Sequence, residues 1–128
     1  MKPISTKQHA ALDYMMGASQ LVLSRSLDAS DGVTKMLRGS GMGILGMGAL
    51  TRNELGLVRV LPMKAHLAAD VVLGGAFLVA PLLFADEDDR VKSVLAGIGA
   101  MATVVTLLTR SQTSSSSQTL EDEALPTT

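Results

Sequence analysis

The stretch from Ala65 to Ala85, AHLAADVVLGGAFLVAPLLFA, constrains the fold more than any other part of this sequence. It holds one histidine and one aspartate near its start and is otherwise apolar. Its length matches the roughly 20 residues that a helix needs to cross the hydrocarbon core of a bilayer. The stretch therefore predicts a transmembrane helix.

Three further stretches have a similar character. Val91–Thr109 carries one lysine near its start and no later charge, and Val33–Thr51 is rich in glycine, which is common in membrane helices. His9–Leu27 is interrupted by Asp13 and Arg25, and a charge at the bilayer centre costs about 2.5–3.5 kcal/mol on insertion scales. The sequence thus predicts four spans, of which the first needs separate support.

That support comes from an internal repeat. KQHAALDYMMGA, at 7–18, aligns with KAHLAADVVLGG, at 64–75, and after one inserted residue the two LTR tripeptides, at 50–52 and 108–110, also align. Two copies of one unit are expected to fold alike, so the first stretch takes the membrane assignment of the third. The aligned pairs include His9 with His66, Asp13 with Asp70, Gly17 with Gly74, and Gly41 with Gly99.

These observations predict an all-α integral membrane four-helix bundle within residues 1–110. It consists of two tandem helical-hairpin repeats, about 7–52 and 64–110. Because each hairpin crosses the membrane twice, the repeats are parallel and related by an axis along the membrane normal. Residues 111–128, rich in serine, threonine and acids, are expected to form a disordered tail.

Charge and composition limit the environment and the partners. Aromatic residues make up only 2% of the chain, whereas small and flexible residues are frequent, with Gly 12 and Met 8, as suits helices packed in lipid. The net charge of -1 gives no reason to expect a nucleic-acid partner, and the lack of cysteine excludes disulfides and thiolate metal sites. More basic residues fall on the side of the two termini, so we expect a multi-pass protein of the cell inner membrane with both termini in the cytoplasm.

The loop joining the two repeats carries a family resemblance. TRNELGLVRVLPMKAHLAAD, at 51–70, resembles the segment that joins the halves of the bacterial SPW-repeat proteins. APLLF, at 80–84, is similar to the Ser-Pro-Trp stretch of that family, although neither copy here has the tryptophan, and HAALDY, at 9–14, resembles its opening. The resemblance implies a small integral membrane protein of two tandem hairpins with no established biochemical activity.

The candidate site is formed by His9, Asp13, His66 and Asp70. Each histidine lies four residues before its aspartate, so each pair shares one helix face, and the predicted axis brings the two faces together. Such a polar cluster suits a divalent metal or a proton relay. We favour a structural interpretation, in which the pairs tie the helix starts together by hydrogen bonds, and assign no metal, cofactor or catalytic residue.

Three functions remain open. The first is a structural or accessory membrane protein that packs against lipid, a second copy or a larger membrane complex. The second is a small ion or proton channel or transporter that uses the His–Asp pairs and requires oligomerisation. An enzyme is disfavoured, because no set of nucleophile, base and orienting group is visible. A soluble methionine-rich bundle is the residual alternative.

Two further patterns are local to one helix or loop. Gly39 and Gly43 have the small-xxx-small spacing of helix-packing surfaces, as do Ala96 and Ala100 in the fourth stretch. The segment NELGLVRVLPM, at 53–63, is expected to form a short interfacial helix with its leucines toward lipid and its arginine toward water.

Overall fold

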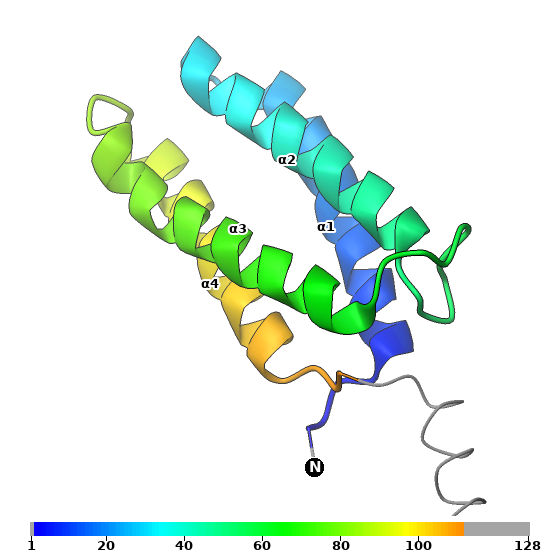
Figure 1. The fold of residues 1–128 in the computed structure, drawn as a ribbon. Coiled ribbons are helices and arrows are strands. Elements are labelled where there is room, and N and C mark those ends of the chain that lie inside the picture. The colour runs from blue at the N-terminus through cyan, green and yellow to red at the C-terminus, as the bar shows by residue number, and fades with distance from the viewer. Residues whose placement is uncertain (1, 112–128) are drawn as a thin grey trace, which may run out of the picture.

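The computed structural model describes residues 2–111 and contains four α-helices (Figure 1). They are α1 (Thr6–Ser26), α2 (Asp31–Leu50), α3 (Met63–Leu83) and α4 (Asp89–Leu107). Each overlaps one predicted apolar stretch, and the described residues contain two isolated bridges but no strand. The prediction of an all-α fold is therefore confirmed. Apart from Ser111, the predicted tail lies outside the described residues.

Side-chain caps explain where the helices begin. Ser5 and Gln8 form a reciprocal capping box before α1. Ser30 and Asp88 each accept a hydrogen bond from a first-turn amide, of α2 and α4 respectively, which satisfies a donor that would otherwise lack a partner. Pro62 is the N-cap residue of α3. Its backbone is extended, with φ −62° and ψ 143°, and no side chain caps this helix. The starts of α1, α2 and α4 are therefore fixed by residues next to them in the sequence.

Most helix packing occurs within two hairpins, α1 with α2 and α3 with α4. In each hairpin two glycines allow the backbones to approach. A Cβ atom on Gly17 would lie 2.9 Å from the carbonyl oxygen of Gly41, and one on Gly99 would lie 2.8 Å from that of Gly74. Such distances are too short for a real side chain, so larger residues here would push the helices apart.

Gly39 and Gly43, which were predicted to lie on a helix-packing surface, do not make this contact. A Cβ atom on Gly39 or Gly43 would have no atom within 4 Å, and both residues are exposed. Ala96 is half-buried and Ala100 is exposed. The physical reason is that the inward face of α2 follows a different helical row, made of Val33, Leu37, Gly41, Ile44 and Gly48.

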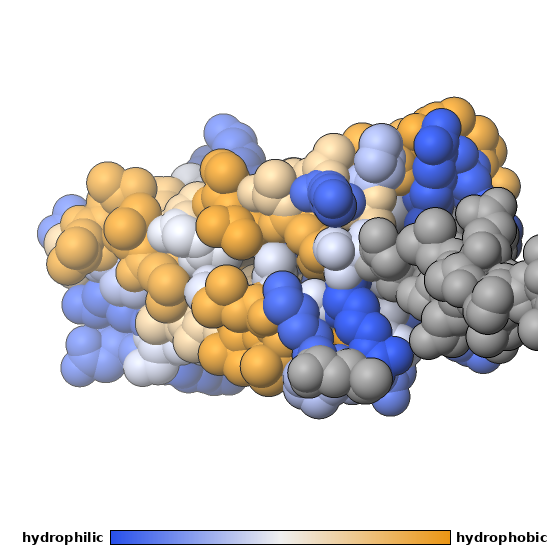
Figure 2. Space-filling view, turned by 60° about the horizontal axis from the view of Figure 1, so that its bottom comes forward, coloured by the Kyte–Doolittle hydropathy of each residue, from blue (hydrophilic) through white to orange (hydrophobic). Residues whose placement is uncertain are grey.

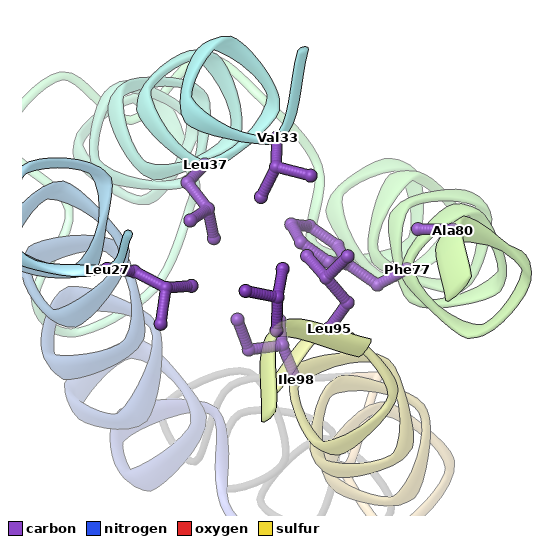
Figure 3. Packing of buried hydrophobic residues seen from close by; sticks show 8 residues of the cluster. Leu27, Val33, Leu37, Phe77, Ala80, Leu95 and Ile98 are labelled. Atoms are coloured by element: carbon purple, nitrogen blue, oxygen red, sulfur yellow. The ribbon is translucent and has the colours of Figure 1, made fainter. Parts of the chain in front are cut away.

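The end of the bundle near the loops after α1 and α3 has an apolar core. Figure 3 shows side chains from both hairpins pointing toward one another there. Leu37, Phe77 and Leu95 are all fully buried. We call this set the apolar end; it comprises Leu27, Val33, Leu37, Phe77, Ala80, Val91, Leu95 and Ile98.

The opposite end is closed by two matching backbone contacts. Ile4, before α1, forms a bridge with Thr109, after α4, and Leu61, before α3, forms a bridge with Thr51, after α2. The predicted interfacial helix at 53–63 is wrong, because residues 53–62 form turns and irregular backbone and Met63 already begins α3. The amides of Leu57 and Val58 instead both donate to the carbonyl of residue 49, at the end of α2.

The outer surface is strongly apolar. Exposed large apolar side chains occur on every helix, for example Met15 at 66%, Met42 at 62%, Leu82 at 79% and Leu107 at 61%. In the view of Figure 2, apolar residues cover much of the face between the two ends of the bundle. Within the described residues, α3 and α4 are long and apolar enough to cross a membrane, and only 28% of each apolar window is buried inside the protein.

Candidate functional site

The four residues of the predicted site meet at one point between α1 and α3. The Nε2 atom of His9 lies 2.9 Å from Oδ2 of Asp70, and Nε2 of His66 lies 2.8 Å from Oδ2 of Asp13. The contacts within each helix are longer, at 3.2 Å in both cases. The closest pairs therefore join the two hairpins, and we call this set of four residues the His–Asp centre.

Helix geometry explains how the centre forms. Residues four apart lie one turn above each other on the same face, so each helix presents a ring nitrogen and a carboxylate together. Both pairs lie in the first turns of their helices, and α1 and α3 begin at the same end of the bundle. The two imidazole rings stand edge to face, with centroids 5.4 Å apart. The arrangement is a closed ring of alternating nitrogen and oxygen atoms.

A threonine fixes the orientation of His9. The Oγ1 atom of Thr109 lies 2.8 Å from Nδ1 of His9 and 2.6 Å from the carbonyl oxygen of Val105. Because the carbonyl only accepts, the hydroxyl uses its proton there and accepts from the ring. Nδ1 of His9 therefore carries a proton, and Nε2 faces the carboxylates.

The second hairpin repeats this arrangement. Thr51 Oγ1 lies 2.6 Å from Nδ1 of His66 and donates to the carbonyl of Met47 at 2.6 Å. Thr51 and Thr109 are fully buried. The sequence predictions gave neither threonine a role, although the two aligned LTR tripeptides at 50–52 and 108–110 were a signal that could have found them.

Burial makes the charge balance of the centre important. His9 and His66 are 1% and 0% exposed, Asp70 is 5% exposed, and the side chain of Asp13 is 13% exposed. With both Nδ1 positions protonated, a proton on each Nε2 makes both rings cationic, so that they donate to the two carboxylates. Two positive and two negative groups then sum to zero, which limits the cost of removing them from water.

A cavity of about 510 Å³ lies beside the centre and mainly between α1 and α4. His9, Asp13 and Asp70 form part of its wall, and the remaining wall is mostly apolar. Through this cavity the His–Asp centre is open at the side of the bundle, between the two hairpins. Its apolar lining includes Leu12, Met15, Met16, Leu73, Met101 and Val105.

Comparison with known proteins adds no relative. The chain matches no family, and no curated protein or solved structure matches it. The SPW-repeat resemblance therefore gains no support, and its implications remain expectations.

Proposed function

We propose that this chain is a small integral membrane protein with a structural or accessory role. In this proposal all four helices cross the inner membrane as two hairpins, with both termini on the cytoplasmic side. A helix of 21 residues, such as α1 or α3, is about 31 Å long, close to the thickness of the hydrocarbon core. The apolar side chains exposed on every helix support contact with lipid, because a soluble monomer rarely exposes such a surface.

One observation carries the structural role: the closest His–Asp contacts run between the hairpins, not within them. Each hairpin packs closely on itself through glycines, whereas the packing between hairpins is sparser. The His–Asp centre therefore acts as a joint that fixes one hairpin against the other. The proposal includes no catalysis, because the ring nitrogens and the contacting carboxylate oxygens already face one another.

The cavity beside the centre favours a second candidate, an ion or proton channel or transporter. A proton entering from the cavity would reach Asp13 and Asp70. Further passage toward the other end of the bundle meets Leu37 and Phe77, which are fully buried apolar side chains of the core. We therefore prefer the structural role for the single chain.

Membrane insertion is tested by alkaline carbonate extraction of cells that express the full chain. We expect the protein to stay in the membrane pellet and to be released only by detergent. Reporter fusions at the two ends should both give the cytoplasmic signal. Release by carbonate would contradict insertion, and opposite signals from the two ends would contradict an even number of spans.

Transport is tested separately with the full chain in liposomes that contain a pH-sensitive dye. The structural role predicts no proton or cation flux above that of empty liposomes. A flux that Asp13→Asn and Asp70→Asn both abolish would instead support the channel.

A further inference from the structure

We infer that the His–Asp centre binds one divalent transition-metal ion, of which Zn²⁺ fits best. Its ligands are Nε2 of His9 and His66 and one carboxylate oxygen each of Asp13 and Asp70. The inference deepens the proposed function, on which it rests for the role of the centre as the joint between hairpins. It makes the metal ion the element that locks this joint.

Four ligand atoms already surround one point. The four candidate atoms lie within 4.8 Å of one another, and the four nitrogen–oxygen separations around the ring are 2.8, 2.9, 3.2 and 3.2 Å. Zinc bonds of roughly 2.0–2.1 Å in a tetrahedron place neighbouring ligands about 3.3 Å apart. A tetrahedron has six such pairs, so the four pairs around the ring must open by a few tenths of an ångström, and the two pairs across it, at most 4.8 Å apart, must close toward the same value. A zinc ion therefore fits once the four side chains adjust from this ring to a tetrahedron.

The threonines supply the outer contacts that metal-binding histidines need. A histidine that binds metal through Nε2 usually donates its Nδ1 proton to an oxygen, which holds the ring and the tautomer in place. Thr109 and Thr51 each accept such a hydrogen bond, and each is itself fixed by donating to a helix carbonyl. Both rings are thus oriented for coordination from opposite hairpins.

Charge also favours a divalent ion. When Nε2 binds metal, each imidazole is neutral, and the two carboxylates balance the double positive charge of the ion. One divalent ion therefore replaces two protons without leaving net charge in the buried centre. A monovalent or trivalent ion would leave an uncompensated charge, which is costly at a buried site.

The ligand types select the class of metal. Imidazole and carboxylate together suit zinc and its first-row neighbours, whereas magnesium and calcium prefer oxygen alone. Four protein ligands leave no open position, which is the pattern of structural zinc sites and not of catalytic ones.

The test uses the purified full chain in mild detergent, stripped of metal and titrated with Co²⁺ as a spectroscopic substitute for zinc. We expect one Co²⁺ per chain, the intense visible absorption of four-coordinate cobalt, and displacement by an equimolar amount of Zn²⁺. The faint spectrum of six-coordinate cobalt, or no stoichiometric binding, would overturn the inference. Neither result bears on membrane insertion, which carbonate extraction measures independently.

Variants show whether the ion sits in the centre. His66→Ala and Asp13→Asn each remove one ligand, from different hairpins, and should abolish the four-coordinate spectrum. Ser19→Ala is the matched control, because Ser19 lines the same cavity but bonds to a carbonyl of its own helix. Unchanged cobalt binding in both ligand variants would overturn the inference.

A variant that keeps all four ligands distinguishes weaker metal binding from loss of folding. Thr109→Val removes only the acceptor for the Nδ1 proton of His9, and loss of such an outer contact typically weakens metal affinity about 10–100-fold. We expect a four-coordinate spectrum with that loss of affinity and with helical content unchanged by circular dichroism. Wild-type affinity in a folded Thr109→Val protein would contradict the orientation of His9 on which the inference depends.

Discussion

At one end of the bundle the two hairpins meet through apolar side chains, and at the other they meet through four ionisable ones. At the apolar end, Leu37 and Phe77 bring the hairpins together by packing. At the polar end, the pairs of His9 with Asp70 and His66 with Asp13 make the corresponding connection. The same two hairpins are therefore joined by two different kinds of chemistry.

The difference between the two ends shows that packing alone does not explain the His–Asp centre. Replacing buried ion pairs with well-packed apolar residues is often neutral or stabilising, so an ionic joint is a poor choice for stability alone. The apolar end demonstrates that this fold accommodates the simpler solution. The presence of two histidines, two aspartates and two orienting threonines at the other end therefore favours a bound ligand, which we infer to be the metal ion.

The largest effect is expected at the apolar end. Phe77→Ala removes a fully buried ring from the contact between hairpins and should lower the free energy of unfolding by about 3 kcal/mol. Denaturation of the full chain in detergent measures this change. Cobalt binding should persist in the folded variant, because Phe77 lies outside the His–Asp centre; loss of binding would show that the two ends do not act separately.

The second-largest effect is the stabilisation that zinc provides when it binds the His–Asp centre. Free zinc at 100 times its dissociation constant should raise the free energy of unfolding by about 2.7 kcal/mol, since it binds the folded state. Asp70→Asn should lose this gain. The comparison is the melting temperature of each protein with zinc and with a chelator, and equal stabilisation of both proteins would place the ion elsewhere.

A smaller effect tests the hairpins themselves. Gly41→Ala places a Cβ atom 2.8 Å from the carbonyl oxygen of Gly17 and should cost about 1–3 kcal/mol, as other overpacked sites do. Gly43→Ala is the matched control, because its Cβ atom meets nothing within 4 Å. Thermal unfolding in detergent that ranks the two variants equally would be inconsistent with the observed face of α2.

The smallest effect is expected at the His–Asp centre when no metal is bound. In the metal-free chain, Asp13→Asn removes one of two buried carboxylates, so one imidazole must also release its Nε2 proton to keep the centre neutral. With that proton released, stability should fall by only about 0.6 kcal/mol, the average for hydrogen bonds between membrane helices. The effect is modest because each imidazole keeps a contact with Asp70. A loss of several kcal/mol with chelator present would mean that the ionic pairs hold the joint unaided.

The sequence predicted the all-α fold because apolar stretches long enough for a helix are a strong signal. It also predicted that His9, Asp13, His66 and Asp70 come together, because helical spacing puts each pair on one face and the repeat expected from the sequence turns the two faces toward each other. It did not identify the packing glycines, because spacing alone does not select among several glycine rows in α2. It did not identify Thr51 and Thr109, because their role depends on backbone bridges between separate segments of the chain.

X-ray absorption at the zinc edge shows directly whether one ion joins the two hairpins. The chain contains only two histidines, and one lies in each hairpin, so a zinc ion with two imidazole ligands in a one-to-one complex must join both hairpins. We predict four nitrogen or oxygen ligands at about 2.0 Å, with the outer scattering of two imidazole rings. A single imidazole, or a shell of six oxygen atoms, would contradict the account of the His–Asp centre as a metal-bound joint.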